Sequence, residues 1–135
     1  MKKIFVGDIH GKTTEFRAII GRNPDAKIFQ VGDMGFGFRG VDTYRFPNNV
    51  RFIRGNHDDP AIHRAHPNYM GDYGYDEESD IFFVSGAFSI DKAWRVEGVS
   101  WWHDEELSAY QFDKCIELYK KIKPGVVISH DCPLN

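Results

Sequence analysis

The chain has 135 residues with a formal net charge of −3, and 41% of its residues are hydrophobic and 15% aromatic. This length predicts a single domain over 1–135 with a core of its own, and the composition excludes an extended disordered chain. No block of lysine or arginine forms a basic stripe, which argues against non-specific nucleic-acid binding and leaves a small phosphorylated substrate possible.

Cysteine content and hydropathy predict the compartment. The two cysteines, Cys115 and Cys132, are too few for a disulfide framework and are expected to be reduced thiols. The apolar run at 4–6 ends at Gly7, too soon for a signal peptide, and no stretch is long enough to cross a bilayer. The sequence therefore predicts a soluble cytoplasmic protein without a membrane partner.

Short apolar runs, most of them followed by a polar loop, recur along the chain. They predict strands at 4–6, 28–31, 50–53, 81–84 and 126–129. Between the first two strands, Thr13 or Thr14 can cap a helix that ends before Asn23, and a second amphipathic helix is predicted over about 108–121. Strands that alternate with helices predict an α/β fold whose ligands lie at the carboxyl ends of the strands.

The loops after four of these strands carry residue types that bind hard metal ions. The candidates are Asp8, His10, Asp33, Asn56 and His130. Carboxylate, amide and imidazole ligands suit manganese, iron or zinc, and the lack of cysteine in these loops argues against a structural zinc site. Two ions about 3.5–4 Å apart need a shared carboxylate, and Asp33 in the middle loop is the natural candidate.

The order of the motifs carries more weight than any one of them. A single Gly-Asp after a strand is a common turn, and His130 by itself could be an ordinary strand-end histidine. Here Gly-Asp-x-His-Gly at 7–11, Gly-Asp at 32–33 and Gly-Asn-His-Asp at 55–58 each follow a predicted strand. The joint pattern favours a metal site.

These motifs, together with Ser129-His130, resemble those of the calcineurin-like metallophosphoesterase superfamily, in particular its bacterial and phage serine/threonine protein-phosphatase-like branch. The resemblance covers nearly the whole chain. It implies an α/β or α+β fold built as a sandwich of two β-sheets flanked by helices. It also implies a hydrolase that cleaves phosphate mono- or diesters by attack of a hydroxide bridging two divalent ions, with manganese expected first and iron or zinc as alternatives.

The resemblance implies a metal ligand at each matching position. Asp8 and His10 would hold the first ion. Asp33 would bridge both ions. Asn56 and His130 would hold the second ion.

The resemblance also implies which residues act on the substrate. His57 would be the general acid that faces the phosphate, with Asp58 as a second catalytic residue. Arg54 and Arg39 are the candidates for substrate binding. The substrate itself, whether a phosphoprotein, a nucleotide or another phosphoester, would be selected by the loops at 35–49 and 60–80.

The chain departs from the family pattern in two places. Phe36 and Gly37 stand where the phosphatase branch has the Asp and Arg of Asp-Arg-Gly, and Asp58, Asp59 or Arg39 are candidates to replace them. The family's final Gly-His-x-His motif, which gives one ligand to each ion, is absent from the sequence. The expectation is therefore a carboxyl-terminally shortened member, whose site is truncated, degenerate or completed by a partner or water.

Two other functions are kept as alternatives. A degenerate or truncated member of the fold could serve in binding or scaffolding, and the metal stoichiometry would separate it from an enzyme. A Rossmann-type nucleotide binder is disfavoured because no Gly-x-Gly-x-x-Gly opens the first helix. The oligomeric state cannot be predicted from these patterns.

Some polar residues have both a functional and an ordinary structural explanation. Lys92 and Arg95 could bind phosphate, but a solvated face is the expectation. His63 and His66 could hold a further metal ion, but exposed histidines are the expectation. Cys132 has no neighbouring base that would make it a nucleophile.

Overall fold

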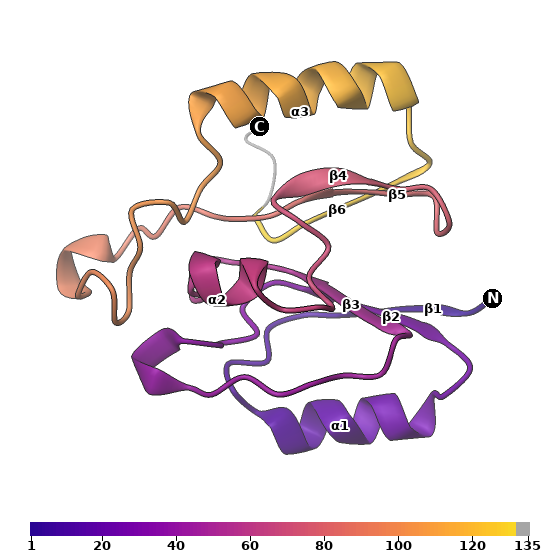
Figure 1. The fold of residues 1–135 in the computed structure, drawn as a ribbon, viewed down its shortest axis with the longest axis horizontal. Coiled ribbons are helices and arrows are strands. Elements are labelled where there is room, and N and C mark those ends of the chain that lie inside the picture. Colours follow the sequence, from indigo (N-terminus) through magenta and orange to yellow (C-terminus); the bar gives the residue numbers. More distant parts are fainter. Residues whose placement is uncertain (132–135) are drawn as a thin grey trace.

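The computed structural model describes residues 1–131, so the prediction for Cys132 lies outside the described part. The chain forms four layers, a helix, two sheets and a second helix (Figure 1). The elements are α1 (Thr13–Arg22), β1 (Lys3–Val6), β2 (Lys27–Val31), β3 (Val50–Ile53), α2 (Pro60–Arg64), β4 (Tyr73–Asp76), β5 (Ile81–Val84), α3 (Ala109–Ile122) and β6 (Val126–Ser129), with the short 3-10 helices η1 (Phe38–Gly40) and η2 (Lys92–Trp94). This arrangement confirms the expected mixed α/β fold with two sheets flanked by helices.

The two sheets have different strand directions. In the first sheet β1, β2 and β3 are all parallel and lie in that order. In the second sheet β4 and β5 are antiparallel, and β5 and β6 are parallel. Parallel strands end at the same edge of a sheet, so the loops after β1, β2 and β3 meet there.

Two hydrophobic cores lie on the two faces of the first sheet. Successive strand residues point to opposite faces, so Ile28 and Phe52 pack on the α1 side while Phe29 and Ile53 pack against the second sheet. Burial on both faces explains why β2 and β3 are rich in apolar residues without a strict alternation of apolar and polar residues. The second sheet contributes Ile81, Phe83 and Ile128 to the core between the sheets.

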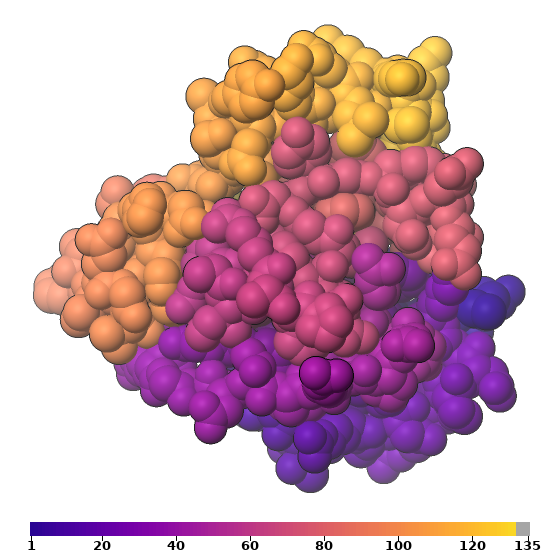
Figure 2. All heavy atoms as spheres, in the orientation of Figure 1, coloured from indigo at the N-terminus to yellow at the C-terminus, as the bar shows by residue number. Residues whose placement is uncertain are grey.

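The segment between β5 and α3 leaves the layered body. Residues 88–105, which we call the lobe, project to one side in the space-filling view (Figure 2). The lobe carries strongly exposed apolar side chains, among them Ile90 at 93% and Trp94 at 88% exposure. Its inner residues Ser89, Ser100 and Glu105 are buried.

Most predicted elements are confirmed, and the differences have local causes. β4 was not predicted, because Gly74 and the neighbouring tyrosines read as a loop. The expected cap of α1 is wrong: Thr13 and Thr14 lie inside the helix, whose N-cap is Lys12 without a side-chain hydrogen bond. Within residues 1–131, no helix has both the length and the hydropathy needed to cross a membrane.

Candidate metal centre

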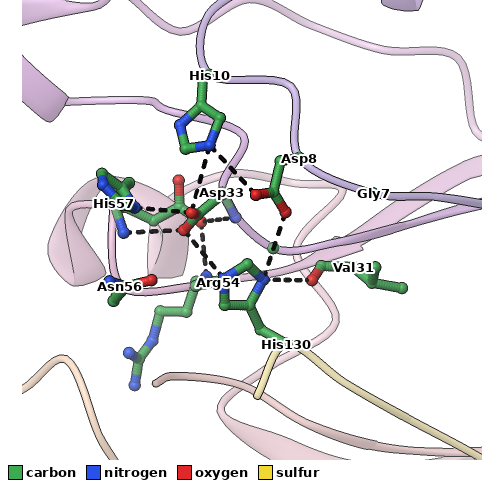
Figure 3. Close-up of polar contacts among 12 residues, drawn as sticks. Gly7, Asp8, His10, Val31, Asp33, Arg54, Asn56, His57 and His130 are labelled. Atoms are coloured by element: carbon green, nitrogen blue, oxygen red, sulfur yellow. Dashed lines mark hydrogen bonds and ion pairs between the residues drawn. The ribbon is translucent and has the colours of Figure 1, made fainter. Parts of the chain in front are cut away.

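The predicted ligand loops converge at one edge of the first sheet (Figure 3). Gln30, fully buried near the end of β2, fastens two of these loops. Its Nε2 donates to the Gly7 carbonyl at 3.1 Å, and its Oε1 accepts from the Gly32 amide at 3.1 Å. The ends of β1 and β2 are thereby held in register where Asp8 and Asp33 follow them.

Asp33 lies at the middle of the cluster. Its side chain is 3% exposed, and its backbone has a φ of 56°, a left-handed conformation that costs energy and is typical of functional sites. One carboxylate oxygen accepts from the His57 amide at 2.9 Å, and the other lies 2.7 Å from His57 Nδ1. The Nε2 atoms of His10 and His130 lie 3.6 Å and 3.4 Å from the same carboxylate.

Two overlapping groups of side chains have the spacing of metal ligands. His10, Asp33 and His57 form one group, and Asp8, Asp33 and His130 form the other, with ligand atoms within 4.8 Å of one another. Asp33 belongs to both groups. The structure therefore brings together four of the predicted metal ligands and adds His57 to them. Asp8 and His10, which were expected to hold the same ion, fall into different groups.

The imidazole of His130 is oriented by the chain behind it. His130 Nδ1 donates to the Val31 carbonyl at 2.9 Å, which leaves Nε2 directed at Asp33. A backbone carbonyl that holds one ring nitrogen fixes the tautomer in which the other nitrogen can bind a metal. This contact also ties β6 of the second sheet to β2 of the first.

Asn56 is positioned by a hydrogen-bond chain into the lobe. Its Nδ2 donates to Ser89 Oγ at 3.2 Å, and Ser89 Oγ donates to the Glu105 carboxylate at 2.6 Å. The amide nitrogen is committed to Ser89, and the amide oxygen is the atom that remains as a possible metal ligand. Ser89 and Glu105 were not singled out in the sequence, because no local motif marks them.

The electrostatics of the cluster fit a bound cation. Burial raises the pKa of Asp33, but hydrogen bonds from His130 and His57 outweigh it and hold that pKa well below its usual range. Burial lowers the pKa of His130, but its hydrogen bond with Asp33 and the charge of that carboxylate outweigh it and raise the pKa to about 9. A proton on His130 thus balances buried negative charge, as a divalent ion would. The oxygen and nitrogen donor set suits manganese, iron or zinc.

Asp58 and Gly55 build the frame behind the cluster. The Asp58 carboxylate is fully buried and accepts from the amides of Asp33 at 2.8 Å, Gly35 at 2.7 Å and Gly55 at 2.7 Å. A Cβ at Gly55 would collide with the Asp33 carboxylate, so only glycine permits this close approach. Asp58, expected as a catalytic residue, has its oxygens turned to these amides.

The two arginines expected to bind substrate make their side-chain contacts outside the metal-ligand groups. Arg54 is fully buried, and its guanidinium points away from the metal-ligand cluster (Figure 3). Its Nη1 donates to the Glu105 carbonyl at 2.6 Å. Arg39 is exposed, with its guanidinium carbon 5.4 Å from the centre of the Phe38 ring. Arg95 reaches the cluster instead, since its Nη2 lies 2.8 Å from His57 Nε2. The expectation of a solvated face for Arg95 is wrong, because its side chain is only 6% exposed.

Comparison with known proteins gives one informative likeness. The chain is 32% identical over 94 residues to the serine/threonine-protein phosphatase PP1-delta of Caenorhabditis elegans, which covers 61% of this chain. The chain spans about 28% of the length of that relative. No protein-family model and no solved structure matches the chain. The likeness supports a phosphoesterase-like origin.

Proposed function

We propose that this chain forms the metal-binding core of a phosphoesterase of the calcineurin-like superfamily. One observation carries the proposal: a buried carboxylate, Asp33, is shared by two groups of potential metal ligands at the carboxyl edge of a parallel sheet. The order of the sequence motifs and the likeness to a serine/threonine-protein phosphatase support it. The substrate class is a phosphate mono- or diester.

The proposed roles of the ligands follow from their positions. Asp33, which belongs to both ligand groups, would be shared between two divalent ions, and Asp8, His10 and His130 would supply the flanking donors, with the Asn56 amide oxygen beside them. When bound, such ions activate water near neutral pH and neutralise charge on the phosphoryl oxygens. Manganese is the first choice for these ligands, with iron or zinc as alternatives.

His57 is the proposed general acid. Its backbone amide and its Nδ1 both contact the Asp33 carboxylate. These two contacts fix the ring with Nε2 directed away from that carboxylate. Nε2 is then the atom that delivers a proton to the leaving alkoxide, a step typically worth about 100- to 10,000-fold in rate. Asp58 acts indirectly in this proposal, as a positioning residue that holds the loops bearing Asp33 and Asn56.

The first experiment measures manganese-dependent hydrolysis of p-nitrophenyl phosphate and of bis-p-nitrophenyl phosphate. We expect turnover by the unaltered chain and its loss, together with weakened manganese binding, in Asp33→Asn. Asp25→Asn, an exposed carboxylate in the turn before β2, is the matched control and should behave like the unaltered protein. The preferred ester would separate a monoesterase from a diesterase.

A binding or scaffolding role for the same metal-binding core is the second candidate. Manganese stoichiometry, measured by calorimetry alongside the assay, separates the two functions. Stoichiometric metal without turnover of either ester would favour the scaffold and contradict the enzyme.

A further inference from the structure

Arg95 is an enclosed cation within the most exposed apolar segment of the chain. Its side chain is 6% exposed although the adjacent Trp94 is 88% exposed. The Nη1 atom donates to the Asn56 carbonyl at 3.3 Å, to Ser89 Oγ at 3.2 Å and to the Ser100 carbonyl at 3.3 Å. These contacts hold one edge of the guanidinium in a fixed position within the lobe.

The other edge of the guanidinium faces the proposed active site. Nη2 lies 2.8 Å from His57 Nε2 and 2.9 Å from an Asp91 carboxylate oxygen. An arginine in a protein is always protonated and only donates hydrogen bonds, so the lone pair of His57 Nε2 is the acceptor. The guanidinium therefore occupies the space beside the atom that, in the proposed mechanism, faces the leaving group.

The second sequence motif has no room for an arginine in this structure. Phe36 is fully buried in the aromatic core, with ring-centre distances of 5.4 Å to Tyr44 and 6.0 Å to Phe46. Gly37 has a φ of 81°, and a Cβ there would lie 2.5 Å from the Cβ of Asp59. A phosphate-binding cation must come from another segment, and the lobe places Arg95 at the cluster.

We propose that Arg95 binds the phosphoryl group of the substrate, exchanging its hydrogen bond with His57 for a pair of hydrogen bonds to phosphoryl oxygens. A guanidinium matches two oxygens of a phosphate in a planar, charge-assisted arrangement, which a lysine ammonium cannot reproduce. The exchange also frees the lone pair of His57 Nε2, which takes up a proton from solvent and then delivers that proton to the leaving alkoxide. This inference rests on the proposed function and assigns one of its substrate contacts.

The test measures the binding of inorganic phosphate to the manganese-loaded protein by isothermal titration calorimetry. We expect Arg95→Ala to weaken phosphate binding at least about tenfold and Arg95→Lys to recover only part of that loss, with manganese stoichiometry unchanged. Arg22→Ala, an exposed arginine at the carboxyl end of α1, is the matched control and should bind phosphate as the unaltered protein does. Equal phosphate affinity in the unaltered protein and Arg95→Lys would overturn the proposal.

A purely structural role for Arg95 predicts a different set of results. Arg95 would then only tie the lobe to the body, so its variants would lower the thermal midpoint while KM and phosphate affinity stayed unchanged. Asp91→Ala removes the ion pair and keeps the guanidinium, and it should change phosphate affinity less than about threefold. If Arg95→Ala does not fold, Arg95→Lys decides the question, because it keeps the charge and loses only the planar fork.

Failure of this inference and failure of the proposed function give different results. A chain that binds phosphate through Arg95 but hydrolyses no ester would contradict the function and keep the inference. A chain that hydrolyses esters with the same KM and the same phosphate affinity after Arg95→Lys would keep the function and overturn the inference.

Discussion

His57 has two explanations at the scale of single residues, as a general acid or as a metal ligand. Its Nδ1 lies 2.7 Å from Asp33, and with His10 it completes one of the two ligand groups. We expect His57→Asn to keep its manganese and to slow hydrolysis of alkyl phosphates about 100- to 10,000-fold, because these leaving groups need a proton. The p-nitrophenolate leaving group needs little protonation, so its hydrolysis should fall much less.

The measurement is kcat for both classes of ester beside manganese stoichiometry by calorimetry. His66→Asn changes a histidine that bonds the Tyr44 carbonyl, away from the metal-ligand cluster, and serves as the control. Loss of one manganese ion in His57→Asn would show that His57 is a ligand and would contradict the general-acid assignment.

The sequence predicts the position of some site residues better than that of others. Asp33 and His10 follow strands within short motifs, so their convergence can be predicted from the parallel sheet. Arg95 reaches His57 across 38 residues of sequence, and its burial depends on the path of the lobe, which no periodicity marks. His63 was expected to be exposed, which is wrong: it is fully buried, and its Nδ1 contacts the Asp59 carbonyl at 2.9 Å.

At the scale of elements, Arg54 joins three segments of the chain. Its Nη1 donates to the Glu105 carbonyl in the lobe, and its Nε lies 3.5 Å from Asp72 before β4. We expect Arg54→Met to lower the free energy of unfolding by about 3 kcal/mol, because it leaves buried polar groups without their cationic partner. Denaturant titration at constant protein concentration measures the change, and phosphate affinity should stay unchanged.

Arg64→Met is the matched control for this prediction. Arg64 bonds the same Asp72 carboxylate but is 40% exposed, so its loss should cost about 1 kcal/mol or less. The two explanations of Arg54 then give opposite results. A substrate-binding Arg54 would raise KM without a large loss of stability, and that outcome would contradict the role assigned by its burial.

Elements buried on both faces were predictable, and irregular ones were not. The apolar-rich runs of β2 and β3 predict strands, and residues on both faces of these strands are buried in the two cores. α3 was predictable from its apolar spacing, and Ser108 with Gln111 forms a capping box at its start. β4 forms by pairing with β5 despite Gly74, a tertiary effect that overrides local propensity.

At the scale of the whole molecule, the second sheet completes the site of the first. β6 lies in the second sheet, yet its end delivers His130 to Asp33, and the hydrogen bond from His130 to the Val31 carbonyl spans the two sheets. The site therefore depends on the packing of both sheets. This explains how a ligand 99 residues away in sequence from Val31 enters the cluster.

The same contact links the stability of the whole fold to pH. The pKa of His130 rises from 6.5 to about 9 on folding, chiefly through Asp33 acting against burial. A raised folded-state pKa gives stability that is fully present below pH 6.5 and lost as the pH rises through about 9. The lowered pKa of Asp33 affects stability only in acid. The stability that the Asp33 carboxylate contributes is present at neutral pH and is lost as the pH falls below the ordinary pKa of an aspartate.

We therefore expect the metal-free protein to lose at most about 3 kcal/mol of unfolding free energy between pH 6.5 and 9. In His130→Asn the titrating group is gone, so the loss over this window should be largely abolished. Saturating manganese should flatten the profile as well, because the ion takes the place of the proton between His130 and Asp33. Denaturant titrations at several pH values, with and without manganese, make the measurement. An equal alkaline loss in His130→Asn would show that other groups cause it, and a slope unaffected by manganese would show that the ion does not bind at this pair.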